Sequence, residues 1–175
     1  ITYKAIKEAD PAATVIMGAI TGFPNRYVAR FRGRFGLDLA ALRGFFVDVL
    51  DYHWYGTSTN EYRLKDTALG TPDVLDTIRA DLYTNEFPRG LPIWCSETSA
   101  YSGDPEDPPD SPELIFPYQT ERLQAIDYFK RHVFPVSRGV RKVFLAWQIM
   151  EEYAMSGNTN NYYDNTGVIY DGQNP

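Results

Sequence analysis

Apolar residues along the chain follow two alternating patterns. Short continuous apolar runs are typical of buried parallel strands, and we expect strands at residues 14–20, 45–55, 91–97 and 142–148. Apolar residues that recur every three or four positions predict helices, at residues 1–9, 26–35, 38–42, 72–83 and 117–136. Helices that alternate with strands in this way predict an α/β fold with a parallel sheet and right-handed crossovers. A doubly wound sheet and a (β/α) barrel both satisfy the pattern.

Two of the predicted helices have an apolar face of the kind that a helix buries against a sheet. In the helix at 72–83, which begins after Thr71 with Pro72 in its first turn, this face contains Val74, Leu75 and Ile78. In the helix at 117–136, the apolar residues at helical spacing are Leu123, Ile126, Phe129 and Val133.

Composition and charge limit the class of protein. The chain has 175 residues, of which 43% are hydrophobic, and this is enough for one globular domain with its own core. A net charge of -6 argues against nucleic acid or an anionic membrane as the partner, because both are bound through clustered Lys and Arg. No run of 18 apolar residues and no signal peptide is present, and the compartment stays unassigned. Because the chain lacks an initiator Met and opens in a helical pattern, we expect it to be a processed product, an engineered segment or a piece of something longer.

Cys95 is the only cysteine, which excludes an internal disulfide and a cysteine metal site within the chain. It lies inside the apolar run at 91–97, where a buried and inert thiol is expected. The two histidines, His53 and His132, have no metal-ligand spacing.

Polar and aromatic groups follow three of the predicted strands at their carboxyl ends, where α/β proteins keep their chemistry. Because side chains alternate along a strand, three sets each share a face, and a barrel would point all three inward. The sets are Asp51, His53 and Tyr55; Ile93, Cys95 and Glu97; and Val143, Leu145 and Trp147.

Glu97 needs the strongest explanation, because a carboxylate at the end of an apolar strand costs several kcal/mol to bury without a partner. It is a candidate catalytic acid or base, or a salt-bridge partner. His53 and Tyr55 could orient it by hydrogen bonds, and Trp147 could supply a flat apolar face. Each of these three could instead be a partly buried group without a function.

The motifs together resemble the C-terminal half of retaining glycoside hydrolases of the large (β/α)8-barrel clan, clan A. They are Lys-Glu-Ala-Asp-Pro-x-Ala-x-Val at 7–15, Val-Asp-Val-Leu-Asp-Tyr-His-Trp-Tyr-Gly at 47–56, Leu-Pro-Ile-Trp-Cys-Ser-Glu-Thr at 91–98, Ser-Arg-Gly-Val-Arg-Lys-Val-Phe-Leu-Ala-Trp at 137–147 and Thr-Gly-Val-Ile-Tyr-Asp-Gly at 166–172. The resemblance implies that residues 1–175 supply about four βα units, strands five to eight of a TIM-type barrel. The remaining half would lie in upstream polypeptide or in a second chain that associates with this one.

The resemblance also implies roles for individual residues. Glu97 would be the nucleophile on strand seven, His53 and Tyr55 the pair on strand six that binds substrate and orients the nucleophile, and Trp147 the sugar platform on strand eight. Trp54 and Tyr101 add aromatic surface that suits a carbohydrate substrate. Such an enzyme needs neither metal nor cofactor.

The acid/base glutamate of that clan follows strand four, and this chain begins after that point of the pattern. Glu86 follows an asparagine but precedes the strand at 91–97, about 20 Å from Glu97 at 3.3 Å per residue, so it is excluded as the partner. Asp51 is closer by face, although a structural role is favoured for it. Glu151 and Glu152 are rim residues that could meet a sugar hydroxyl.

Two other functions remain open from the sequence. The first is a non-catalytic carbohydrate-binding barrel or barrel fragment, with no acid near Glu97. The second is a (β/α) enzyme of another kind, or a lone open α/β domain, in which Glu97 acts as a general base.

Overall fold

A computed structural model of the chain describes residues 2–17, 47–55, 74–84, 87, 89–105, 117–146, 149 and 165–169. The helices and strands among these residues are, in chain order, α1 (Thr2–Ala9), β1 (Leu50–Tyr55), α3 (Val74–Thr84), β2 (Ile93–Ser99), α4 (Glu121–Ser137) and β3 (Lys142–Leu145). The helices predicted at 26–35 and 38–42 lie outside the described residues. Among the described helices, none combines the length and apolar character that crossing a membrane requires.

The strands form a parallel sheet in the order β1-β2-β3. Ile16 adds a parallel bridge to Val49, and the Met17 N–H donates to the Val49 carbonyl at 2.9 Å, so the described part of the run predicted at 14–20, residues 14–17, joins the sheet beside β1. The mixed α/β fold with a parallel sheet is confirmed. Neighbouring segments of the described sheet follow one another in chain order, an order that occurs in barrels and on either side of the switch point of a doubly wound sheet.

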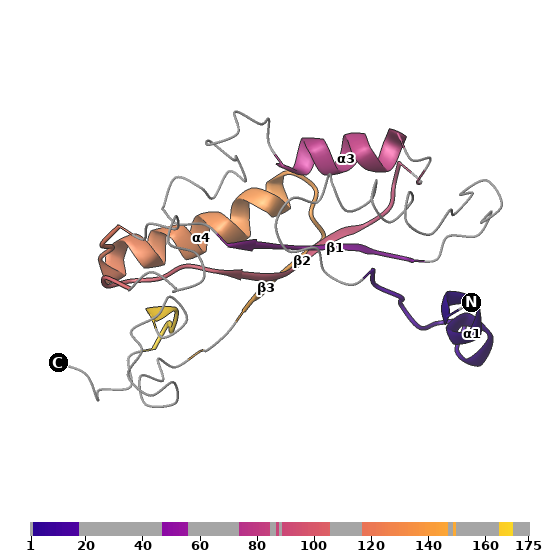
Figure 1. Ribbon diagram of the computed structural model, residues 1–175, viewed down its shortest axis with the longest axis horizontal. Helices are drawn as coiled ribbons and strands as arrows, with labels where there is room; N and C mark the ends of the chain where they lie inside the picture. Colours follow the sequence, from indigo (N-terminus) through magenta and orange to yellow (C-terminus); the bar gives the residue numbers. More distant parts are fainter. Residues whose placement is uncertain are drawn as a thin grey trace.

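The helices α3 and α4 lie on the same side of the strands (Figure 1). Leu75, Ile78 and Leu82 of α3 are buried in one cluster with residues of β1 and β2. The predicted apolar face of this helix is therefore confirmed at Leu75 and Ile78.

The orientation of α4 contradicts the simple apolar pattern. Its apolar residues form an exposed stripe that includes all four positions at helical spacing, and we call it the α4 stripe: Leu123, Ile126, Phe129, Val133 and Val136. The buried residues of α4 are instead mostly polar: Gln124, Asp127, Tyr128, Arg131 and Pro135.

Hydrogen bonds explain why α4 turns its polar side inward. The Gln124 amide contacts the carbonyl oxygens of Ala100, Asn165 and Gly167 at 3.1–3.3 Å, and the Tyr128 hydroxyl donates to the Thr166 carbonyl at 2.5 Å. These contacts satisfy loop carbonyl groups that would be costly to bury alone. The helix thus ties the segment after β2 to residues 165–169.

The ends of α4 follow local rules. Its first turn is capped by the Thr120 side chain, which accepts a hydrogen bond from the Leu123 N–H at 3.3 Å, and so the helix begins at Glu121 and not at Pro117. Gly139, with a φ of 86°, follows its C-terminal end, as expected for a residue that must adopt the left-handed conformation.

Asp48 attaches α1 to the start of the sheet. One oxygen accepts a hydrogen bond from the Tyr3 hydroxyl at 2.8 Å, and the other lies 2.8 Å from both Lys7 Nζ and the Val15 N–H. The contact with Lys7, followed by the Val15 and Tyr3 hydrogen bonds, lowers the pKa of the Asp48 carboxyl.

Candidate active site at the carboxyl ends of the strands

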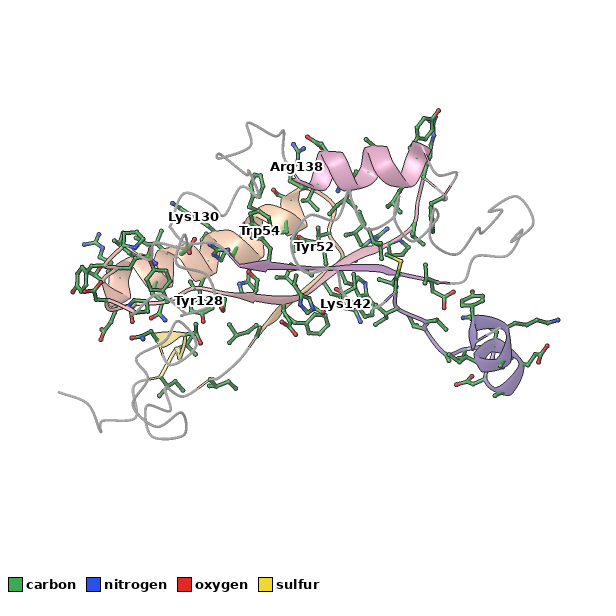
Figure 2. The ribbon with its side chains drawn as sticks, viewed as in Figure 1. Tyr52, Trp54, Tyr128, Lys130, Arg138 and Lys142 are labelled. Atoms are coloured by element: carbon green, nitrogen blue, oxygen red, sulfur yellow. The ribbon has the colours of Figure 1, made fainter. Side chains whose placement is uncertain are left out.

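The sheet has two chemically different faces. The helix side carries the core residues Leu50, Tyr52, Ile93 and Cys95, with Val143 packed against them. The opposite side carries Asp51 and His53 of β1, Trp94 of β2, which pairs with Asp51, and Lys142 of β3, which pairs with Trp94. In Figure 2, Tyr52 and Trp54 are labelled on the helix side of the strands and Lys142 on the other side.

This arrangement corrects the prediction that three sets of strand residues share one face. Ile93, Cys95 and Val143 lie on the helix side, opposite Asp51 and His53. A strand with regular alternation from Cys95 would have turned Glu97 toward the helices as well.

A β-bulge brings Glu97 to the opposite side. Cys95 pairs with Tyr52 and Glu97 pairs with His53, so Ser96 is an extra residue without a partner of its own in the ladder. Bulges are rare in parallel pairs, and they redirect side chains where they occur. Because paired residues in register share a face, Glu97 lies on the side of His53.

Glu97 and His53 form the central contact of the site. The Glu97 Oε2 atom lies 3.1 Å from His53 Nδ1, and the two side chains are 37% and 12% exposed. The carboxylate is therefore held by a neighbour and still open to a ligand. The other ring nitrogen, His53 Nε2, lies 3.1 Å from Ser96 Oγ.

Asp51 supports the bulge from β1. It is buried, and its two oxygens accept hydrogen bonds from Ser96, one from the N–H at 2.9 Å and one from the hydroxyl at 2.5 Å. The structural role favoured for Asp51 fits these contacts. Ser96 was missed by sequence reasoning, although two consecutive polar residues, Ser96 and Glu97, break the apolar run just where the bulge occurs.

The other predicted site residues lie in different places. Trp54 packs against the core on the helix side, and Tyr101 is completely buried with its hydroxyl donating to the Pro117 carbonyl at 2.6 Å. Trp54 thus lies on the side of the sheet opposite Glu97, and the contact of these two rings with a sugar stays a prediction. The backbone of Tyr55 pairs with Ser99, but its side chain and Trp147 lie outside the described residues. Glu86, Glu151 and Glu152 also lie outside them.

On the face of the sheet that carries Glu97, Trp94, Lys142 and Phe144 form a cluster of two aromatic rings and one cation. Lys142 Nζ lies 4.1 Å from the centroid of the Trp94 ring, and the Phe144 ring centroid lies 6.1 Å from that of Trp94. A cation over an indole face at this distance is a stabilising contact.

Cys95 is buried beneath the site, as predicted, and its thiol donates to the Glu97 carbonyl at 3.3 Å. Burial raises the pKa of this thiol to about 12, so it stays protonated at neutral pH. In the described part of the chain, no group of three or more His, Cys, Asp or Glu side chains is placed to hold a metal ion.

No family model and no curated protein matches the sequence. Solved structures do match. An endo-laminarinase from Formosa Hel1_33_131 has a TM-score of 0.58 at 11% identity, with 97% of this chain and 47% of that chain covered. A GH2 β-galacturonidase from Eisenbergiella tayi has a TM-score of 0.54 at 18% identity, with 99% and 26% covered. A β-1,3-glucanosyltransferase from Rhizomucor miehei has a TM-score of 0.54 at 14% identity, with 97% and 51% covered.

Sequence identities this low establish likeness of fold only. The chain spans about a quarter of the length of the β-galacturonidase and about half of the length of the other two proteins. Almost the whole chain takes part in each match. The parallel sheet with its helices therefore has a fold relationship to glycoside hydrolases.

Proposed function

We propose that this chain is the C-terminal half, strands five to eight, of the (β/α)8 catalytic domain of a retaining glycoside hydrolase, with Glu97 as the nucleophile. The contact between Glu97 and His53 carries the proposal. It joins a partly exposed carboxylate to an imidazole at the carboxyl ends of two adjacent parallel strands, which is where barrel enzymes keep their catalytic groups. The fold relationship to glycoside hydrolases supports the same reading.

In the proposed reaction, one Glu97 oxygen attacks the anomeric carbon while the bond to the leaving oxygen breaks, and a covalent glycosyl ester forms. A second carboxyl group about 5 Å away protonates the leaving oxygen and then activates the water that cleaves the ester. Asp51 is unsuited to that second role because both of its oxygens already accept hydrogen bonds from Ser96. The acid/base glutamate belongs to the other half of the barrel.

The edge of the sheet supports the need for that other half. Within the described residues, β3 is an edge strand, and its Phe144 and Leu145 are 42% and 36% exposed. An uncovered strand edge with apolar side chains is a liability unless another strand pairs with it. A further parallel strand beside β3 would close the sheet toward a barrel.

The test is hydrolysis of a panel of nitrophenyl glycosides by the full-length protein, followed by mass spectrometry after treatment with a fluorinated glycoside that traps the ester. We expect label on Glu97 and a loss of at least about 10³-fold in kcat for Glu97→Gln, because the nucleophile itself is removed. Glu8→Gln is the control, since Glu8 is an exposed carboxylate of α1 that is 67% accessible.

Label on another residue, or full activity of Glu97→Gln, would refute the nucleophile assignment. Binding of oligosaccharides without any hydrolysis or label would instead favour the non-catalytic carbohydrate-binding protein that the sequence left open.

A further inference from the structure

The hydrogen bonds around Ser96 determine where one hydrogen atom lies on His53. Asp51, which is 4% exposed, can only accept when it is a carboxylate, and the single hydroxyl hydrogen of Ser96 is directed to it at 2.5 Å. The Ser96 oxygen is then left as an acceptor. The ring nitrogen at 3.1 Å from it, His53 Nε2, must therefore be the donor and carry a hydrogen.

The other ring nitrogen faces the candidate nucleophile. His53 Nδ1 lies 3.1 Å from Glu97 Oε2, within ion-pair distance, but this approach does not have the geometry of a hydrogen bond. The tautomer of His53 is therefore set by the hydrogen bond on its Ser96 side and not by Glu97.

We infer that Asp51 is a positioning residue that acts on Glu97 through Ser96 and His53. It holds the bulge by accepting the Ser96 N–H, and it fixes the Nε2–H form of His53 by accepting the Ser96 hydroxyl. The ring hydrogen of His53 is thereby kept on Nε2, and the ring is held with Nδ1 toward Glu97. The value of this arrangement for catalysis depends on the proposed function, whereas the position of the hydrogen atoms does not.

Asp51→Asn reverses the direction of the hydrogen bonds and so tests the inference. The asparagine oxygen can still accept the Ser96 N–H, but its amide group donates to the Ser96 oxygen, which frees the hydroxyl hydrogen to turn toward His53. Nε2 becomes an acceptor and the hydrogen moves to Nδ1. The bulge is retained while the tautomer changes.

The measurement is ¹⁵N NMR of histidine side chains in the full chain, with the His53 signals assigned by their loss in His53→Asn. We expect a protonated Nε2 in the unaltered protein and an unprotonated Nε2 in Asp51→Asn. The control is Asp127→Asn, which removes another buried carboxylate, 1% exposed and paired with Arg131 at 2.8 Å, and leaves the His53 signals unchanged.

Ser96→Ala is the second variant in case Asp51→Asn does not fold. It removes the acceptor of Nε2 but leaves the Ser96 backbone N–H bonded to Asp51, and both His53 tautomers should then appear. An unprotonated Nε2 in the unaltered protein, or an unchanged tautomer in both variants, would overturn the inference. Because the spectrum needs no turnover, this outcome is independent of whether Glu97 attacks a sugar.

Discussion

Two aspartates close together in the sequence illustrate how single residues position larger parts of the molecule. Asp51 holds the bulge through Ser96, and Asp48 holds α1 through Tyr3 and Lys7. Each carboxylate uses both oxygens. A substitution at either position therefore affects a neighbour that lies far away along the chain.

Asp48 makes stability depend on pH. Because contacts in the folded chain lower its pKa below the unfolded value, its stabilising contribution is present above about pH 4 and is lost as the pH falls toward the folded-state pKa. We expect Asp48→Asn to unfold more easily at neutral pH and to lose less stability than the unaltered chain as the pH falls below about 4. Urea unfolding at several pH values measures both effects, and an identical pH dependence in the variant would contradict them.

At the level of elements, the sequence located the helices and strands better than it oriented them. The run at 91–97 predicts β2 because continuous burial is a local property of the strand. The separation of Glu97 from the face of Cys95 could not be predicted, since it depends on contacts of Ser96 with Asp51, which lies 45 residues away in the sequence. The inward side of α4 was likewise decided by distant loop carbonyl groups that need Gln124 as a partner.

The α4 stripe gives a test of this reversed orientation. Phe129 is 68% exposed, and we expect Phe129→Gln to change the free energy of unfolding by less than about 0.5 kcal/mol, as is usual for surface substitutions. Leu75→Ala is the matched core variant, because Leu75 of α3 is fully buried, and it should cost about 2–5 kcal/mol. Denaturant titrations compare the two, and a loss of several kcal/mol in Phe129→Gln would mean that the stripe is buried.

At the level of the whole molecule, the described sheet has a protected centre and an exposed edge. β2 lies between β1 and β3, whereas β3 pairs with β2 on one side within the described residues. If a strand of the proposed other barrel half pairs with β3, the backbone amide groups of β3 become hydrogen-bonded and buried, and they change more than those of β1 or β2.

Hydrogen exchange measures this difference by region. In the 175-residue chain alone, we expect the amides of β2 to exchange more slowly than those of β3, because edge strands open more readily. With the proposed other half of the barrel present, β3 should gain protection until it resembles β2. Equal protection of β3 in both proteins would show that no added strand pairs with this edge.

The bulge in β2 also has a consequence for the comparison of sequences. Cys95 and Glu97 lie two positions apart and yet face opposite sides of the sheet. The alternation of side chains between the two faces therefore shifts by one residue at Ser96. A related strand without the extra residue would need its acid one position earlier, in the place of Ser96, to reach the same point in space. An ungapped alignment of two such strands would pair this glutamate with a residue that faces the helices, although both proteins place a carboxylate beside the same histidine.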